Sequence, residues 1–333
     1  MISAWLEALI LGVVQGLTEF IPVSSSGHLV LVPYLAGWEK PSLAFDVMLH
    51  FGTLGAVLMY FRGELLAIAR GILRLDRTAE GLAYRRVGLY IVPASVPVAL
   101  VGLLLRDRVE EAFATPLLPA VLLLVTAGLL LAVEAVRDRR VAAAKAVQDQ
   151  SAEGGVAFAD AEDPAWTGDW RAADGEDATT PVIAPAVALP LGADASDPRG
   201  ADLSQLTLRQ AMVAGLFQCL AVLPGISRSG ATIAGGVFTG LTREAATRFS
   251  FILVIPALAG ATLLSLPDLS EGGETAIELV VGITAAFVSG YLAIRFLVAL
   301  VSRERLTGFA YYCIAASAVG LIGYAMLGPP STV

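Results

Sequence analysis

Charge and cysteine are both scarce in this sequence. Only 16% of its 333 residues are Asp, Glu, Lys or Arg, whereas an average soluble domain carries about 25%. The two cysteines, Cys219 and Cys313, lie far apart in apolar segments and form no CxxC pair, so we interpret them as small buried hydrophobic residues. The mean hydropathy is +0.73 and 56% of residues are hydrophobic, which excludes an ordinary soluble protein and indicates a membrane protein.

Long apolar runs recur along the chain. A run of roughly 17–25 residues is the length that crosses a bilayer core. The clearest are Leu43–Phe61, Val87–Leu105, Leu117–Val136, Ala245–Leu266, Ala276–Leu300 and Phe309–Leu327. The N-terminal apolar run has no Lys or Arg ahead of it and contains Glu7, so we do not expect a cleaved signal.

The acidity of the chain is concentrated in one hydrophilic insert. Twelve acidic and only three basic residues lie between Lys145 and Gln205, in a segment without a lasting helical or strand period. We therefore predict a first membrane repeat at 1–142, an acidic, mostly disordered cytoplasmic insert at 143–206, and a second membrane repeat at 207–333. A solvated linker is a better interpretation of the insert than a binding segment for a basic partner.

The two halves of the chain resemble each other. Residues Gly12–Gly27 read GVVQGLTEFIPVSSSG, and residues Gly215–Gly230 read GLFQCLAVLPGISRSG. Gly, Gln, Leu, Ser, Ser and Gly recur in register, and only the proline shifts by one place. Because three long apolar runs follow each motif, this similarity indicates an internal repeat.

Each repeat begins with two apolar pieces that a Pro-Ser-Gly stretch interrupts. The pairs are Ile2–Ile21 with Gly27–Gly37, and Leu208–Leu223 with Gly230–Leu241. Free backbone groups at the break cannot face lipid, so each pair is predicted to form a re-entrant hairpin. We predict an all-α integral membrane protein with inverted-topology repeats, each a re-entrant helix-loop-helix hairpin plus three transmembrane helices.

Arginines predict the orientation of this fold. Six arginines lie in Arg62–Arg86, which is therefore expected in the cytoplasm, whereas the only charged residues of Pro267–Thr275 are acids, which places that loop outside. These constraints place both termini outside and bring the two broken tips together near the middle of the membrane.

Ionisable residues at that depth are costly and need partners or a wet cavity. Glu19, His28 and Arg228 occupy the broken stretches, and an ion pair that locks the hairpins is one explanation for them. A phosphate site explains the surrounding hydroxyls better, because helix starts present free N–H groups and Arg228 offers a planar fork. The predicted substrate-binding residues are Gln15, Ser24, Ser26, Gly27, Gln218, Ser227, Ser229, Gly230 and Thr232.

Several chemical roles are open for the polar residues of the first motif. Glu19 could hold a divalent metal or act as a base, and His28 could be a general acid, a nucleophile, or the base that activates a serine such as Ser25. Asp46 and His50 share a face of the first span at i, i+4 spacing. We favour a structural hydrogen bond or a cavity lining for this pair over a pair of metal ligands.

The two motifs, together with FDVMLHFGTL and FSFILVIPAL, closely resemble the undecaprenyl-diphosphate phosphatase family, also called the bacitracin-resistance protein family. The resemblance covers the chain except the acidic insert. It implies a multi-pass enzyme of the bacterial inner membrane that opens to the outer face, needs a divalent cation (Mg²⁺ or Ca²⁺) and hydrolyses undecaprenyl diphosphate, which recycles the lipid carrier for cell-wall synthesis. It also implies that Glu19, Ser25, His28 and Arg228 are catalytic, with Glu19 at the metal.

The sequence departs from that family at one position of the motif. Many members resemble EGLTEF there, with two glutamates, whereas this chain has Gln15 in place of the first. A transporter or flippase of a phosphorylated lipid or small anion is the alternative function, because inverted repeats and broken helices suit it equally well. The expected partners are undecaprenyl diphosphate and membrane lipid, with no nucleic acid; a homodimer is the assembly we consider.

Overall fold

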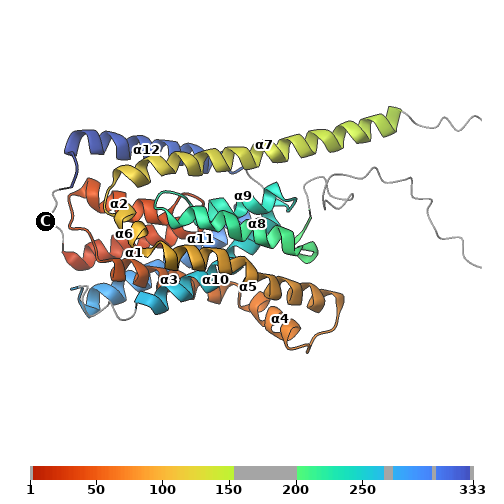
Figure 1. The fold of residues 1–333 in the computed structure, drawn as a ribbon, viewed down its shortest axis with the longest axis horizontal. Coiled ribbons are helices and arrows are strands. Elements are labelled where there is room, and N and C mark those ends of the chain that lie inside the picture. The colour runs from red at the N-terminus through yellow and green to blue at the C-terminus, as the bar shows by residue number, and fades with distance from the viewer. Residues whose placement is uncertain (1–2, 154–200, 266–272, 302–304, 331–333) are drawn as a thin grey trace, which may run out of the picture.

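The structure is a computed structural model that describes residues 3–153, 201–265, 273–301 and 305–330. Within these ranges nearly all regular structure is helical (Figure 1). The α-helices are α1 (Ala4–Phe20), α2 (Ser25–Ala36), α3 (Leu43–Tyr60), α4 (Arg62–Ile72), α5 (Ala79–Leu104), α6 (Arg106–Phe113), α7 (Leu117–Glu153), α8 (Leu208–Gln218), α9 (Arg228–Phe238), α10 (Arg243–Ser265), α11 (Ala276–Val301) and α12 (Thr307–Leu327).

Among the described residues, six helices are long and apolar enough to cross a membrane: α3, α5, α7, α10, α11 and α12. They coincide with the six predicted spans, and the chain is an all-α, multi-pass membrane protein. Helix α5 begins at Ala79, before the predicted Val87, because the Thr78 side chain accepts a hydrogen bond from the N–H of Gly81 and caps the first turn.

Two shorter helix pairs are interrupted at the predicted places. Helices α1 and α2 are separated by residues 21–24, and α8 continues into a short 3-10 helix (Cys219–Val222) before α9 begins. The two interruptions lie against each other. A Cβ on Gly27 would lie 3.1 Å from Cα of Gly225, and one on Gly230 would lie 3.5 Å from Cβ of Pro22. The close approach that glycine permits at Gly27 is therefore to the opposite interruption.

The helices of the two halves interleave. Helix α1 packs along α11, and α8 packs along α5, so each broken pair lies against the other half of the chain. Both contacts are very close: a Cβ on Gly12 would lie 2.4 Å from the carbonyl oxygen of Gly282, and one on Gly215 would lie 2.0 Å from that of Ala94. Helices α7 and α12 run side by side along one edge of the molecule (Figure 1).

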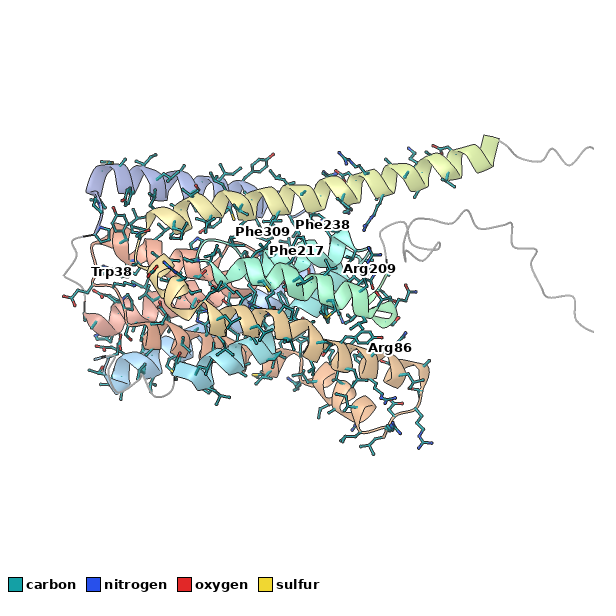
Figure 2. All side chains as sticks on the ribbon, in the orientation of Figure 1. Trp38, Arg86, Arg209, Phe217, Phe238 and Phe309 are labelled. Carbon is teal, nitrogen blue, oxygen red and sulfur yellow. The ribbon has the colours of Figure 1, made fainter. Side chains whose placement is uncertain are left out.

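The helical bundle has two distinguishable ends (Figure 1). Helix α4 and the far end of α7 lie at one end, and α6 and the C-terminus lie at the other (Figure 1). Figure 2 places Arg86 and Arg209 toward the α4 end and Trp38 at the opposite end. Glu134 in α7 accepts hydrogen bonds from Arg243 (2.8 Å) and the N–H of Leu306 (3.0 Å), which joins α7, α10 and the start of α12.

Two segments differ from the sequence prediction. Helix α7 continues past residue 142 to Glu153, so the first residues of the expected insert are helical. The arginine-rich segment expected as a loop contains α4, an amphipathic helix with polar residues on one face and apolar residues on the other. Most of the predicted insert, residues 154–200, lies outside the described residues, while Ala201 returns to the bundle and pairs with Leu241.

Candidate active site

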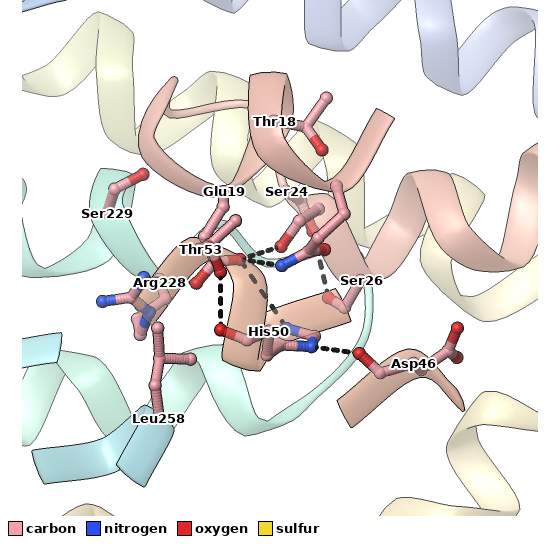
Figure 3. Close-up of polar contacts among 12 residues, drawn as sticks. Thr18, Glu19, Ser24, Ser26, Asp46, His50, Thr53, Arg228, Ser229 and Leu258 are labelled. Atoms are coloured by element: carbon pink, nitrogen blue, oxygen red, sulfur yellow. Dashed lines mark hydrogen bonds and ion pairs between the residues drawn. The ribbon is translucent and has the colours of Figure 1, made fainter. Parts of the chain in front are cut away.

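Glu19, in the last turn of α1, is the centre of a polar cluster (Figure 3). Its side chain is only 3% exposed. Arg228 Nη2 donates to Glu19 Oε1 at 2.5 Å, and Ser25 Oγ donates to Glu19 Oε2 at 2.5 Å. Gln15 Nε2 also donates to Oε2, at 3.1 Å. The carboxylate thus joins residues that the sequence had placed in two separate motifs.

The two interruptions explain why these groups meet. Ser25 is the first residue of α2 and Arg228 is the first residue of α9, so both stand at helix N-termini. Ser24 caps α2 by accepting from the N–H of Gly27, and Ser227 caps α9 by accepting from the N–H of Gly230. Two helix N-termini directed at one region favour a bound anion.

Ser24 has an unusual backbone conformation. Its φ of 70° lies in the left-handed region, which costs a residue other than glycine about 1–3 kcal/mol. This turn directs Ser25 back toward Glu19. The Ser24 carbonyl accepts from His28 Nδ1 at 2.7 Å, and the Ser24 and Ser26 hydroxyls share a hydrogen bond at 3.3 Å. Strain at this turn is consistent with a site whose geometry is held by its surroundings.

His50 belongs to the same cluster. Its Nε2 lies 3.7 Å from Glu19 Oε2, and its side chain is 22% exposed. The His50 ring is held from its other side, because Nδ1 bonds to the backbone carbonyl of Asp46 at 2.7 Å. Thr53 donates to the His50 carbonyl at 2.9 Å. Figure 3 shows the His50 ring between Asp46 and Glu19.

His28 lies close in sequence but has other partners. Its Nε2 is 2.8 Å from the hydroxyl of Tyr312 in α12, and the two rings stack with centroids 5.6 Å apart. Its Nδ1 bonds to Ser24 as described above, so neither ring nitrogen is paired with Glu19. The break at Pro22 therefore brings Ser25, rather than His28, to the carboxylate.

The remaining predicted residues are mostly engaged within the second broken pair. Ser227 and Ser229 share a hydrogen bond at 3.1 Å. The Thr232 hydroxyl bonds to Ser250 at 2.5 Å and to the Arg228 carbonyl at 2.9 Å, so it supports the turn that presents Arg228. Gln218 is 1% exposed, and no contact in the described part of the chain joins it to Glu19.

Several buried polar atoms of this region have no hydrogen-bond partner within the described residues. They are Gln15 Oε1, Asp46 Oδ1, Arg228 Nη1, and both amide atoms of Gln218. Unpaired buried polar groups are rare in native proteins, and an absent ligand or water is a usual explanation. Both donors and acceptors are unpaired, which suits a hydrated phosphate group better than a simple apolar ligand.

The cluster also bears on the predicted metal site. No group of three or more His, Cys, Asp or Glu side chains suited to a metal occurs in the described ranges. Among the described residues, Glu19 is the carboxylate of this cluster; Ser25 Oγ lies 2.5 Å and His50 Nε2 3.7 Å from its Oε2, and both could also contact a cation. A cation here would need further ligands from a substrate, and diphosphate oxygens commonly serve that purpose for Mg²⁺.

His50 is the main residue of the site that sequence reasoning undervalued. The i, i+4 spacing with Asp46 placed the two residues on one helix face, but the hydrogen bond goes to the Asp46 backbone carbonyl rather than to its carboxyl group. The spacing also could not show that Nε2 of the ring lies near Glu19. Tyr312 and Ser250 were not anticipated either, because a lone tyrosine or serine in an apolar span carries no spacing signal.

The fold and this cluster define a class: a multi-pass α-helical membrane protein with a buried carboxylate–guanidinium site at two opposed helix breaks. Comparison with known families makes the class specific. Residues 8–159 and 179–319 match the family model described as bacitracin resistance protein BacA. The chain belongs to this family.

Named relatives extend over almost the whole chain. A protein of Desulfosudis oleivorans named undecaprenyl-diphosphatase is 40% identical over 329 residues, covering 95% of this chain and 97% of its own length. Proteins of the same name from Methanobrevibacter smithii and Gemmatimonas aurantiaca are 36% and 35% identical. The first covers 92% of this chain and 93% of its own length, and the second covers 98% of each.

Proposed function

We propose that this protein is an undecaprenyl-diphosphate phosphatase, which hydrolyses undecaprenyl diphosphate to undecaprenyl phosphate and inorganic phosphate. The names of its full-length relatives support the substrate. The structural observation that carries the proposal is the Glu19 carboxylate, which contacts Ser25 from one broken pair and Arg228 from the other. The reaction would recycle the lipid carrier for cell-wall synthesis in the bacterial inner membrane and so confer bacitracin resistance.

Arg228 is proposed to bind the diphosphate. One of its terminal nitrogens already bonds to Glu19, while Nη1 is buried and has no partner within the described ranges. A guanidinium can therefore keep its carboxylate contact and donate to a phosphate oxygen at the same time. The N-termini of α2 and α9 add positive potential to the same region, which stabilises the charge on the transferred phosphoryl group.

Ser25 is proposed as the nucleophile and Glu19 as its base. Ser25 Oγ attacks the terminal phosphorus while its proton passes to Glu19, and the bond from phosphorus to the bridging oxygen breaks. Undecaprenyl phosphate leaves with the proton from Glu19. Water then attacks the phosphoserine, Glu19 accepts a proton from the water and returns it to Ser25 Oγ, and inorganic phosphate is released.

His28 is proposed to be a positioning residue for Ser25. It holds the Ser24 carbonyl on one side and the Tyr312 hydroxyl on the other, so it fixes the turn that presents Ser25. The alternative, in which His28 itself attacks phosphorus, would require the ring to leave Tyr312 and to turn toward Glu19. The 2.5 Å contact between Ser25 and Glu19 favours the serine.

A divalent cation is part of the proposal. Glu19 and diphosphate oxygens would hold it, with Mg²⁺ or Ca²⁺ as the ions that oxygen ligands favour. Gln15 donates to Glu19 through Nε2 and has a buried Oε1 without a partner among the described residues, but it adds no second negative charge for such an ion. When bound, the cation would neutralise charge on the phosphate oxygens during transfer.

We also propose that the two halves are inverted repeats in the membrane. The contacts between helices support this. If α1, α3 and α5 are equivalent to α8, α10 and α11, the contact of α1 with α11 corresponds to that of α8 with α5, and the contact of α3 with α11 corresponds to that of α10 with α5. Arginine-rich α4 would face the cytoplasm, the termini would lie outside, and the site would open to the outer face along Asp46 and His50.

Phosphate release from undecaprenyl diphosphate in detergent micelles tests the proposed function. Micelles have no two compartments, so a transporter or flippase has nothing to move, whereas a hydrolase still releases phosphate. We expect release in the presence of Mg²⁺ or Ca²⁺, with one phosphate for each undecaprenyl phosphate formed. A monodisperse, folded protein that binds the lipid and releases no phosphate would favour the transport function, which the exchanged helix contacts also suit.

A further inference from the structure

The His50 ring has a defined arrangement of its two nitrogens. A backbone carbonyl can only accept a hydrogen bond, so the 2.7 Å contact with the Asp46 carbonyl requires the hydrogen on Nδ1. In the neutral ring, Nε2 then carries a lone pair, and it lies 3.7 Å from Glu19 Oε2. A ring in this tautomer can therefore offer the Nε2 lone pair to a cation that lies between it and Glu19, in a mostly buried site.

This arrangement is typical of a histidine that binds a metal. Metal-ligating histidines nearly always donate their other ring N–H to a carbonyl or carboxylate, which fixes the tautomer and orients the ring. Ligand atoms about 2.1 Å from a shared ion lie at most about 4.2 Å apart, so the 3.7 Å gap is compatible with a common ion. Gln15, whose Nε2 donates to the same carboxylate, also has a buried Oε1 without a partner among the described residues.

We propose that His50 Nε2 is a ligand of the divalent cation at Glu19, so that an imidazole in α3 takes the place of the second carboxylate that Gln15 does not provide. This inference rests on the cation of the proposed function and adds a protein ligand to it. Diphosphate oxygens and water would complete the coordination, since the described residues offer no third His, Cys, Asp or Glu there.

Two consequences follow for binding. Imidazole suits ions that accept nitrogen ligands, so Mn²⁺ should bind more tightly than Mg²⁺ or Ca²⁺, which prefer oxygen. Arg228 already shares the Glu19 carboxylate, so a second positive charge at the site needs the negative charge of a diphosphate. The soluble analogue methylenediphosphonate should therefore raise the affinity for Mn²⁺ at least about tenfold.

Histidine content makes a direct experiment possible, because His28 and His50 are the only two histidines in the chain. The full chain is purified in detergent with an affinity tag that contains no histidine. Mn²⁺ is bound in the presence of methylenediphosphonate, and pulsed electron paramagnetic resonance measures nitrogen coupled directly to the ion. We expect histidine nitrogen coupling in the wild type and in His28→Gln, and its loss in His50→Gln with about a tenfold or greater weakening of Mn²⁺ binding.

Each other outcome contradicts the assignment. Bound Mn²⁺ without nitrogen coupling in the wild type would show that His50 is not a ligand, while the cation itself would stand. Coupling that disappears in His28→Gln and persists in His50→Gln would show that His28, and not His50, binds the ion. No Mn²⁺ binding at all would remove the cation from the proposed function as well. Phosphate release and thermal unfolding, measured on the same samples, separate these results from loss of hydrolysis or of folding.

Discussion

Replacing Arg228 removes the cation that joins the two broken helix pairs. In the structure its guanidinium makes one contact of 2.5 Å with Glu19 and keeps Nη1 buried and without a partner in the described residues. Lysine retains the charge, but it lacks the planar fork of nitrogens that lets arginine contact Glu19 and a phosphate oxygen at the same time. Alanine removes both contacts and leaves the buried Glu19 carboxylate without its closest counter-charge.

The size of the effect follows from these contacts. A hydrogen bond to a charged group contributes about 1.5–3 kcal/mol, and about 1.4 kcal/mol corresponds to a tenfold change in rate. Losing one such contact in Arg228→Lys predicts a fall in kcat/KM of about 10- to 150-fold. Losing two in Arg228→Ala predicts a fall of about 10²- to 10⁴-fold.

Phosphate release in detergent measures both variants, and Arg305→Ala is the matched control. Arg305 also pairs with a carboxylate, that of Asp138 at 3.0 Å, but its side chain is 56% exposed and lies away from Glu19. We expect the control to retain activity within about twofold, because exposed ion pairs contribute little. Arg228→Ala activity within threefold of the wild type would refute the diphosphate-binding role of Arg228.

Three further predictions concern the nucleophile and the packing. Ser25→Ala should reduce phosphate release by at least about 10³-fold and abolish the phosphoserine that mass spectrometry of acid-quenched wild-type reactions should detect; full activity without Ser25 would exclude it as the nucleophile. Gly215→Ala should lower the Tm in detergent, because its Cβ would lie 2.0 Å from the Ala94 carbonyl and overpacking costs about 1–3 kcal/mol, whereas Gly128→Ala, with nothing within 4 Å, should leave the Tm unchanged. Glu134→Ala should lower the free energy of unfolding by about 3–5 kcal/mol, and therefore the Tm, because it removes a buried charge partner of Arg243; an unchanged Tm would contradict this.

Much of the fold could be predicted from local sequence. Apolar runs of about 20 residues were enough to place the six long helices. Pro22 and Pro224, in two similar motifs, were enough to place the two broken pairs, because in lipid the backbone must satisfy its own hydrogen bonds. The extension of α7 to Glu153 was missed, since acidic and alanine-rich composition was interpreted as disorder.

The sequence indicated several of the polar residues that cluster around Glu19, but not which of them touch each other. Glu19 and Arg228 were identified because ionisable groups in an apolar stretch need a reason to be there, and Ser25 was singled out among the serines by the family resemblance. Which of them touch depends on the turn at Ser24, whose positive φ directs the serine rather than His28 to the carboxylate. The contact between Glu19 and His50 joins two helices, and no spacing within a single segment could indicate it.

The most direct test of the central claim is phosphate release by Glu19→Gln beside the wild type. Glutamine keeps the size of the side chain and can accept from Ser25, but it cannot take the serine proton or pair ionically with Arg228. The variant is compared with the wild type at equal Tm and equal binding of the lipid substrate. We predict that release falls at least about 10³-fold while the substrate still binds. Release close to that of the wild type would contradict the claim that Glu19 is the base at the centre of the active site.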